Sequence, residues 1–290
     1  MAPSATPDYF TLGIQGLAGY VGGFAASPLM QISNKSCLPK VSVREVLRMT
    51  SNSPFVGATW AATRQSLSSV RGTTSIMYMR NCMKKTQQIS LLDYLRAILV
   101  ASAAETFIAG IPFEVPETRV QSGFSRYSWH CIKAVPFMYV RNVITCVAPA
   151  YFCREEMLLE HQSKVKSGWG SEGDCGAGSE KVVDESKGVR SGRLSAKRGR
   201  GSWASAIGYT GLMSFCMAVL GSPVQGIVGR ILQEEGVTSA CRNALRDFNL
   251  NDPQKRSVTA LRVASRASAN AITGISITVA FLFARDVMNV

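Results

Sequence analysis

Histidine and paired cysteines are scarce in this sequence, and their scarcity removes several classes of protein. The chain has only two histidines, His130 and His161. A Ser–His–Asp hydrolase triad and a histidine-rich metal site are therefore not expected. The cysteines form no CxxC pair, so neither a zinc site nor a disulfide framework is indicated, and small buried residues are favoured. They are Cys37, Cys82, Cys131, Cys146, Cys153, Cys175, Cys216 and Cys241.

Catalytic and targeting signals are also missing. No nucleophile–base constellation and no phosphate-cradling glycine loop stand out, so we expect no enzyme. The first ten residues, MAPSATPDYF, carry no basic n-region and no arginine-rich amphipathic stretch. We therefore expect neither a signal peptide nor a transit peptide, and we expect any organelle targeting to be internal.

The composition points to membrane helices around a polar interior. The chain has 290 residues, of which 46% are hydrophobic, and its mean hydropathy is +0.09. These values are high for a soluble protein and low for purely apolar spans. A net charge of +13 predicts an acidic partner, which could be anionic lipid, an anionic solute or nucleic acid.

Uncharged runs are the main feature that is present, and some reach the roughly 20 residues that cross a bilayer. The three clearest runs are 9–34, 201–229 and 267–284. Three weaker candidates, each interrupted by charge, bring the expected number of helices to six; they are 53–83, 91–121 and 134–159.

The first run is rich in glycine, at Gly13, Gly16, Gly19, Gly22 and Gly23. Small residues at this density let helix backbones approach closely in lipid. A flexible glycine loop fits less well, because the run holds no charge and few other turn residues.

Residues 160–202 interrupt this pattern with a low-complexity insert rich in glycine, serine and charge. The basic tract 187–200 at its end could contact RNA or anionic lipid, although such a tract is more often a solvated loop. No aromatic stacking platform accompanies it, so no nucleic acid is expected.

A threefold repeat relates the rest of the chain. In each repeat a proline follows a small-residue run, a base stands seven residues later, and an arginine lies in the next helix. The prolines are Pro28, Pro112 and Pro223; the bases are Lys35, Arg119 and Arg230; the arginines are Arg64, Arg141 and Arg266. The repeats extend over 9–85, 91–159 and 203–290 within a single domain.

This pattern resembles the mitochondrial carrier family, whose motif is Pro-x-(Asp/Glu)-x-x-(Lys/Arg)-x-(Lys/Arg)-x-Gln. The stretch PFEVPETRVQ matches it at Pro112, Glu114, Arg119 and Gln121. The resemblance implies an all-α membrane protein of six transmembrane helices in three pseudo-symmetric two-helix repeats. It also implies a multi-pass location in the mitochondrial inner membrane, kink prolines facing the matrix, and both termini and 160–202 facing the intermembrane space.

The matrix gate of that family is degenerate in this chain. The resemblance places acid–base pairs at six positions, and here no such pair can form among them. The six residues are Met30, Ser33, Glu114, Glu117, Gln225 and Val228. Glu114 and Glu117 would repel each other unless one is protonated or unless Arg119 or a partner's base neutralises them. The opposite gate is also incomplete, at Met77 and Arg80, Arg154 and Met157, and Val279 and Leu282.

Two ligand sites follow from the same resemblance. Arg64, Arg141 and Arg266 stand where the family contacts its substrates, and three converging guanidiniums would bind an anion; the alternative is that they are remnants. Bound cardiolipin, an anionic phospholipid, is the other ligand implied, although the corresponding turns, 55–57 and 132–134, are weakened here.

Two functions remain open at this stage. The first is a transport-impaired carrier-fold protein that acts as a structural or accessory subunit of an inner-membrane complex, the respiratory chain or the ATP synthase. The second is a working carrier of a small anionic metabolite. The surroundings of Glu114 and Glu117 should separate them: bases from another chain would indicate assembly, and bases from the same chain a rewired gate.

Overall fold

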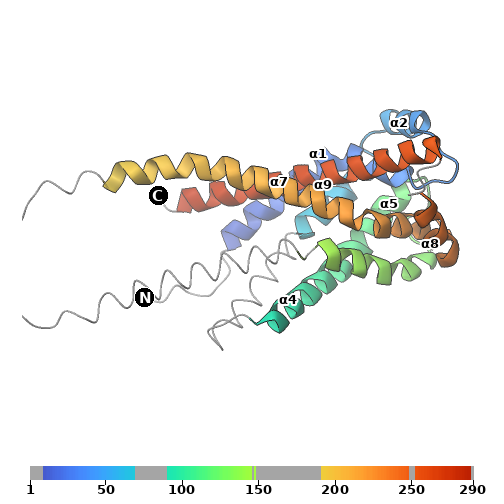
Figure 1. Cartoon of the computed structure of the whole chain (residues 1–290), viewed down its shortest axis with the longest axis horizontal. Coiled ribbons are helices and arrows are strands. Elements are labelled where there is room, and N and C mark those ends of the chain that lie inside the picture. Colours follow the sequence, from blue (N-terminus) through green and yellow to red (C-terminus); the bar gives the residue numbers. More distant parts are fainter. Residues whose placement is uncertain (1–8, 69–89, 146, 148–190, 248–251, 289–290) are drawn as a thin grey trace, which may run out of the picture.

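The computed structural model describes residues 9–68, 90–145, 147, 191–247 and 252–288. These residues are helical with no strand among them, which confirms the predicted all-α class. Long helices lie along one another in an elongated bundle (Figure 1). The short helices α2 (Val43–Ser51) and α8 (Val237–Arg246) lie at one end, which we call the short-helix end.

In the described part of the chain, six helical segments form the bundle, and neighbours in the chain are neighbours in space. In chain order they are α1 (Tyr9–Lys35), 58–68, Leu91–Gln121, 130–145, α7 (Ser191–Leu232) and α9 (Pro253–Met288). The last segment, α9, packs along both α7 and α1. The six segments therefore follow one another around a ring that closes between the two ends of the described chain.

Glycines bring α1 close to two of its neighbours in this ring. A Cβ added at Gly19 would stand 2.7 Å from the backbone oxygen of Gln65, in the segment 58–68. A Cβ added at Gly22 would stand 3.0 Å from the side chain of Ser276, in α9. The prediction that the glycine-rich run allows close approach of helix backbones is thereby confirmed.

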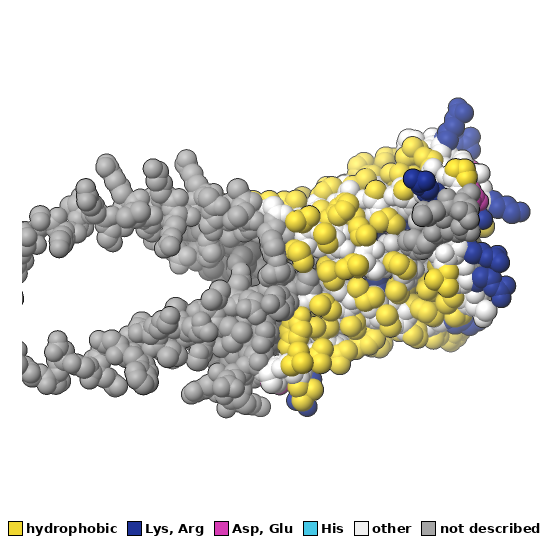
Figure 2. Space-filling view, viewed as in Figure 1, with side chains coloured by type: hydrophobic (Ala, Val, Ile, Leu, Met, Phe, Trp, Pro, Cys, Tyr) yellow, Lys and Arg dark blue, Asp and Glu magenta, His cyan; other side chains and the backbone are white. Residues whose placement is uncertain are grey.

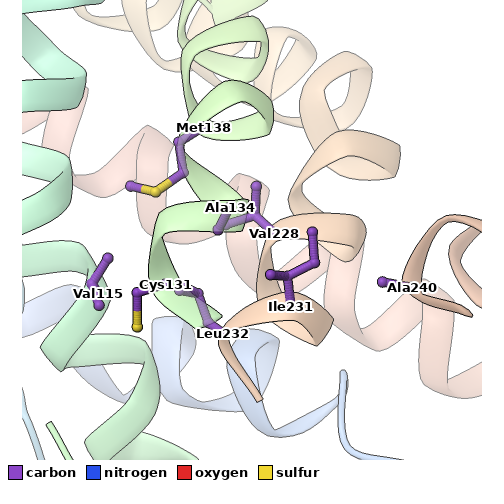
Figure 3. Close-up of a cluster of buried hydrophobic side chains, with 8 residues drawn as sticks. All are labelled: Val115, Cys131, Ala134, Met138, Val228, Ile231, Leu232 and Ala240. Atoms are coloured by element: carbon purple, nitrogen blue, oxygen red, sulfur yellow. The ribbon is translucent and has the colours of Figure 1, made fainter. Parts of the chain in front are cut away.

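A small apolar core joins the second and third repeats near the short-helix end. Ala134 and Met138 of the segment 130–145 pack against Val228 and Ile231 of α7 (Figure 3). Val115 completes one side of the cluster from α5 (Val115–Gln121).

The segment Leu91–Gln121 changes its helical form along its length. It begins at a capping box in which Ser90 accepts from the backbone of Asp93 and Asp93 accepts from the backbone of Ser90. α4 (Leu91–Ala104) then passes into a ten-residue π-helix, η1 (Glu105–Glu114), which contains Pro112, and ends as α5. Pro28 and Pro223 likewise lie inside helices, in α1 and α7.

The first helices of the predicted second and third repeats end in the same way. Gly123 and Glu234 both have a positive φ, +83° and +70°, and they stand at the same distance along the chain from Pro112 and Pro223. In each case the next N–H donates to the carbonyl five residues earlier, at 2.8 and 3.0 Å, which is the helix-ending pattern of a Schellman motif. This shared ending is independent of the residue types on which the repeat was predicted.

Two helices among the described residues are long and apolar enough to cross a membrane, Leu91–Gln121 and Thr210–Leu232. The first coincides with one of the weaker predicted spans, 91–121, and the second falls largely within the run 201–229. The expectation of six spans is supported for these two only. In addition, α7 begins at Ser191, inside the predicted insert 160–202, whose residues 160–190 lie outside the described part.

Candidate functional site

The six predicted gate residues are all buried, and they lie on the three helices that carry the prolines. Met30 and Ser33 lie on α1, Glu114 and Glu117 at the junction of η1 and α5, and Gln225 and Val228 on α7. Arg64, Arg141 and Arg266 are buried as well, on the three intervening helical segments. The structure brings both sets together, because the arginines reach the gate residues directly.

Arg64 joins the first repeat to the second. Its Nε donates to Oε2 of Glu117 at 2.8 Å, and both side chains are buried. Its Nη2 lies 3.1 Å from the thioether sulfur of Met30, which is a weak acceptor. Met30, which stands where the resemblance places an acid in the first repeat, is therefore in contact with Arg64. Its uncharged thioether does not neutralise the guanidinium.

Arg141 pairs with an acid of its own repeat, the second, and contacts the third through Gln225. Its two terminal nitrogens donate to the two carboxylate oxygens of Glu114, with Nη2 at 2.8 Å from Oε2. Nη1 also donates to Oε1 of Gln225 on α7. A bidentate pair of this kind is the strongest geometry available to arginine and a carboxylate.

Asn142 and Thr106 hold Arg141 in place. The amide oxygen of Asn142 accepts from Nη2 of Arg141 at 2.7 Å, and its Nδ2 donates to the Thr106 hydroxyl at 3.0 Å. This support from η1 and from the neighbouring residue fixes the plane of the guanidinium. Sequence reasoning missed both residues, because a single Asn after an arginine carries no motif.

Arg266 closes the arrangement from α9. Its Nη2 lies 3.4 Å from Oε1 of Glu114, the oxygen that Arg141 also contacts. Its Nη1 is buried and has no hydrogen-bond partner among the described residues. We call Arg64, Arg141, Arg266, Glu114 and Glu117 the arginine–glutamate cluster. The cluster holds three guanidiniums and two carboxylates, and a third buried acid, Glu105, faces the same interior.

The π-helix explains why a third acid, Glu105, faces the same interior. Glu105 is buried and accepts from the Ser68 hydroxyl at 2.7 Å. It precedes Glu114 by nine residues, which make about two and a half turns of an α-helix and would put the two acids on opposite faces. The wider turn of η1 brings both to the inner face. A pattern search at the α-helical period cannot detect this.

The bases that follow the prolines do not reach the glutamates. Lys35 donates to the backbone oxygen of Met49 at 2.7 Å, and Arg230 pairs with Asp247 at 3.0 Å. Arg119 donates to the backbone oxygen of Leu232 at 2.7 Å and pairs with Glu234 at 2.9 Å. The interpretation that Arg119 neutralises Glu114 and Glu117 is therefore wrong, because its guanidinium is engaged in closing the short-helix end.

The remaining predicted features lie partly outside the described residues. Met77, Arg80, Arg154 and Met157 fall there, and so do the side chains of the tract 187–200 and of Leu282. Of the turns considered for cardiolipin, 55–57 leads into the helix 58–68, while 132–134 lies inside the helix 130–145 and is not a turn.

Comparison with known proteins adds no assignment. No family model matches the sequence, and no match is found among curated proteins or among solved structures. Within the described residues no three His, Cys, Asp or Glu side chains are grouped so as to hold a metal ion. The site is therefore interpreted from its own geometry.

Proposed function

We propose that the chain is a divergent carrier-fold membrane protein in which transport is impaired, and that it acts as a structural or accessory subunit of a mitochondrial inner-membrane complex. The observation that carries the proposal is the occupied state of the arginines. Glu114 takes up the donors of Arg141 and one of Arg266, and Glu117 takes up Nε of Arg64. The groups that would bind an anionic solute are thus paired within the chain.

The carrier-type arrangement is supported by the order of the helices. Six segments follow one another around a ring that α9 closes against α1, and Pro28, Pro112 and Pro223 lie inside the first helix of each repeat. The matching helix ends at Gly123 and Glu234 support an internal duplication. The proposed fold is therefore three two-helix repeats around a polar interior.

A membrane location is supported by the outer surface. A wide apolar band covers the visible side of the bundle, and lysine and arginine gather at the short-helix end (Figure 2). The exposed large apolar side chains include Leu95, Leu99, Phe107, Leu212 and Leu220. The exposed bases on and beside α2 and α8 are Lys40, Arg44, Arg48, Arg242 and Arg246. Such a basic end suits anionic phospholipid headgroups such as those of cardiolipin, which we propose as a partner with neighbouring subunits.

Impaired transport follows from what opening would require. Alternating access would separate Arg64 from Glu117 and Arg266 from Glu114, which belong to different repeats. Leaving one member of a buried pair without its partner costs roughly 3–5 kcal/mol. Arg141 and Glu114 both belong to the second repeat, whereas the other two contacts cross between repeats and would have to break when the repeats separate. The cluster therefore favours one closed arrangement of the bundle.

A carrier of a small anionic metabolite is the second candidate. The bases that neutralise Glu114 and Glu117 come from the same chain, which is the arrangement expected of a rewired gate. Nη1 of Arg266, which has no partner among the described residues, also favours an anionic ligand.

Reconstitution and native separation distinguish the two candidates. For the accessory role we expect no uptake of labelled di- or tricarboxylates into proteoliposomes above that of protein-free liposomes. In native gels of gently solubilised inner membranes we expect the chain to migrate in stoichiometric amounts with a large complex. Saturable exchange that Arg141→Ala abolishes would refute the accessory role and establish the carrier.

A further inference from the structure

The link between the two long helices of each repeat carries exposed apolar side chains. Leu245 of α8 is 73% exposed, the largest value of any leucine in the described part of the chain, and Leu47 of α2 is 44% exposed. Both helices lie at the short-helix end (Figure 1), where lysine and arginine gather (Figure 2). These leucines are therefore set among bases, unlike the leucines of the apolar band.

The two leucines stand in the same local pattern. α2 contains REVLR (44–48) and α8 contains RNALR (242–246), so each reads Arg-x-x-Leu-Arg. In both, the leucine and the two arginines are exposed, whereas the residue before the leucine, Val46 or Ala244, is buried. Residues three and four apart share a face of a helix, so each leucine lies outward beside arginines. We call these two surfaces the leucine–arginine faces.

The second repeat exposes apolar groups beside an arginine in another form. Its link, 122–129, is not helical, and it follows α5, whose Arg119 closes the short-helix end. Trp129 is 85% exposed, Tyr127 is 57% exposed, and Arg126 is exposed beside them. Tryptophan, tyrosine and arginine are the residue types enriched at the centres of protein–protein interfaces. All three links thus present apolar side chains next to arginine.

The apolar sides of α2 and α8 are already used inside the molecule. Val46 and Thr50 of α2 are buried, as are Ala240 and Ala244 of α8, and the two helices pack on α1 and α7. A helix that lies in a membrane surface instead puts its apolar side into the lipid. Each outward face here offers one leucine, which is little surface for insertion into lipid and has no use in binding a headgroup.

The charges of these faces select an acidic partner. α8 contains no acid, and the acids beside it, Glu235 and Asp247, pair with Arg230. α2 contains one acid, Glu45. Electrostatic complementarity across an interface therefore requires carboxylates on the other side, and the leucines require apolar pockets. A protein supplies both at fixed positions, whereas a bilayer surface supplies only the anions.

We propose that the leucine–arginine faces of α8 and α2 dock an acidic protein, a neighbouring subunit that receives Leu245 and Leu47 in apolar pockets rimmed by Asp or Glu carboxylates. The inference rests on the proposed function, because it names the surface by which an accessory subunit meets its complex. It goes beyond that function in assigning the contact to two short helices and in giving the chemistry of the partner.

The test is a zero-length cross-link. Arg242→Lys keeps the charge of the α8 face and adds an amine, which a carbodiimide joins to a carboxylate in direct contact with the loss of water. In native inner membranes we expect this variant to form an amide with an Asp or Glu of one other protein, identified by mass spectrometry of the linked peptides. The wild type has no amine at this position and is the blank.

Leucine variants decide whether the face, rather than charge alone, makes the contact. Arg242→Lys/Leu245→Ser should lower the adduct yield at least about tenfold, because a leucine buried in the partner is lost. Arg242→Lys/Leu91→Ser is the matched control and should keep the yield. Leu91 is 71% exposed and begins α4, which starts at the opposite end of the bundle (Figure 1). All these side chains are exposed, so every variant should keep the Tm of the wild type.

The same pair of variants on α2, Arg44→Lys with and without Leu47→Ser, repeats the test independently. A face covered by phospholipid would give no adduct on either helix, and Arg242→Gln/Arg246→Gln would lose co-purified cardiolipin while Leu245→Ser would not. That result overturns the inference. So does an adduct with a second copy of this chain, or an adduct whose yield Leu245→Ser leaves unchanged.

The two proposals fail separately. If no adduct forms while the wild type still migrates with a large complex and transports nothing, only the docking surface is removed. If a leucine-dependent adduct forms while the wild type transports a solute, only the accessory role is removed.

Discussion

At Gly19, the addition of a single methyl group is predicted to push two helices apart. The site lies where α1 meets the segment 58–68, and a Cβ there would stand 2.7 Å from the backbone oxygen of Gln65 and 3.1 Å from Cα of Ser66. Because the nearest atom belongs to the backbone, no side-chain rotation relieves the clash. Gly19→Ala therefore has to push α1 away from its neighbour, which loosens the first repeat.

The magnitude follows from a comparison with Gly13, which is exposed in the same helix and has nothing within 4 Å of an added Cβ. Replacing glycine by alanine inside a helix gains up to about 1 kcal/mol from backbone propensity at either position. Overpacking costs about 1–3 kcal/mol and applies to Gly19 only. Since the propensity gain is common to both variants, the difference between their free energies of unfolding gives the steric cost alone, about 1–3 kcal/mol.

Thermal unfolding of the two purified variants in the same detergent measures this difference. At roughly 2–4 °C for each kcal/mol in a chain of this size, Gly19→Ala should unfold several degrees below Gly13→Ala. Gly13→Ala should be at least as stable as the wild type. Equal midpoints for the two variants would show that α1 and the segment 58–68 are not in close contact, and the packing described for the first repeat would be wrong.

Two further predictions concern charged groups. Glu114→Gln should destabilise the folded protein by about 3–5 kcal/mol, which is more than Arg141→Gln does, because it leaves two guanidiniums without their acceptor. A double-mutant cycle of these two substitutions should give a coupling free energy of about 0.5–3 kcal/mol. Additive effects of the two substitutions on stability would contradict the pairing. The hydrogen bond from Arg119 lowers the pKa of Glu234 below its ordinary 4.5, so its contribution to stability is present above pH 4.5 and is lost as the pH falls through the lowered value. Melting curves between about pH 6 and about pH 3 should therefore fall less steeply for Glu234→Gln than for the wild type, and parallel curves would argue against the bond.

Much of the framework follows from local chemistry. The uncharged runs, the glycines of α1 and the three prolines predict long helices that pack closely, because helix formation and small-residue contact depend on neighbours in the chain. The burial of Arg64, Arg141 and Arg266 could also be predicted, since an arginine in an apolar membrane helix almost always faces the interior of the bundle.

The pairing of the gate and the arginines could not be predicted in the same way. No acid–base pair was expected among the six gate residues, and the arginines were expected either to form a separate anion-binding centre or to be remnants. Whether the two sets meet depends on the relative heights and rotations of helices as far apart in the chain as Glu114 and Arg266. The π-helix adds a rotation that the α-helical period does not contain, and it turns Glu105 and Glu114 to the same side.

The amino-acid sequence by itself thus determined a helical, basic, apolar-surfaced chain with a threefold internal pattern, because these properties are sums over single residues and short spacings. Only the tertiary structure decided that two acids on one helix pair with arginines from three others, and that Arg119 is used elsewhere. The physical reason is that a buried charge pairs with the opposite charge that the packed helices bring closest to it. The distance between the two charges depends on the packing of the whole bundle.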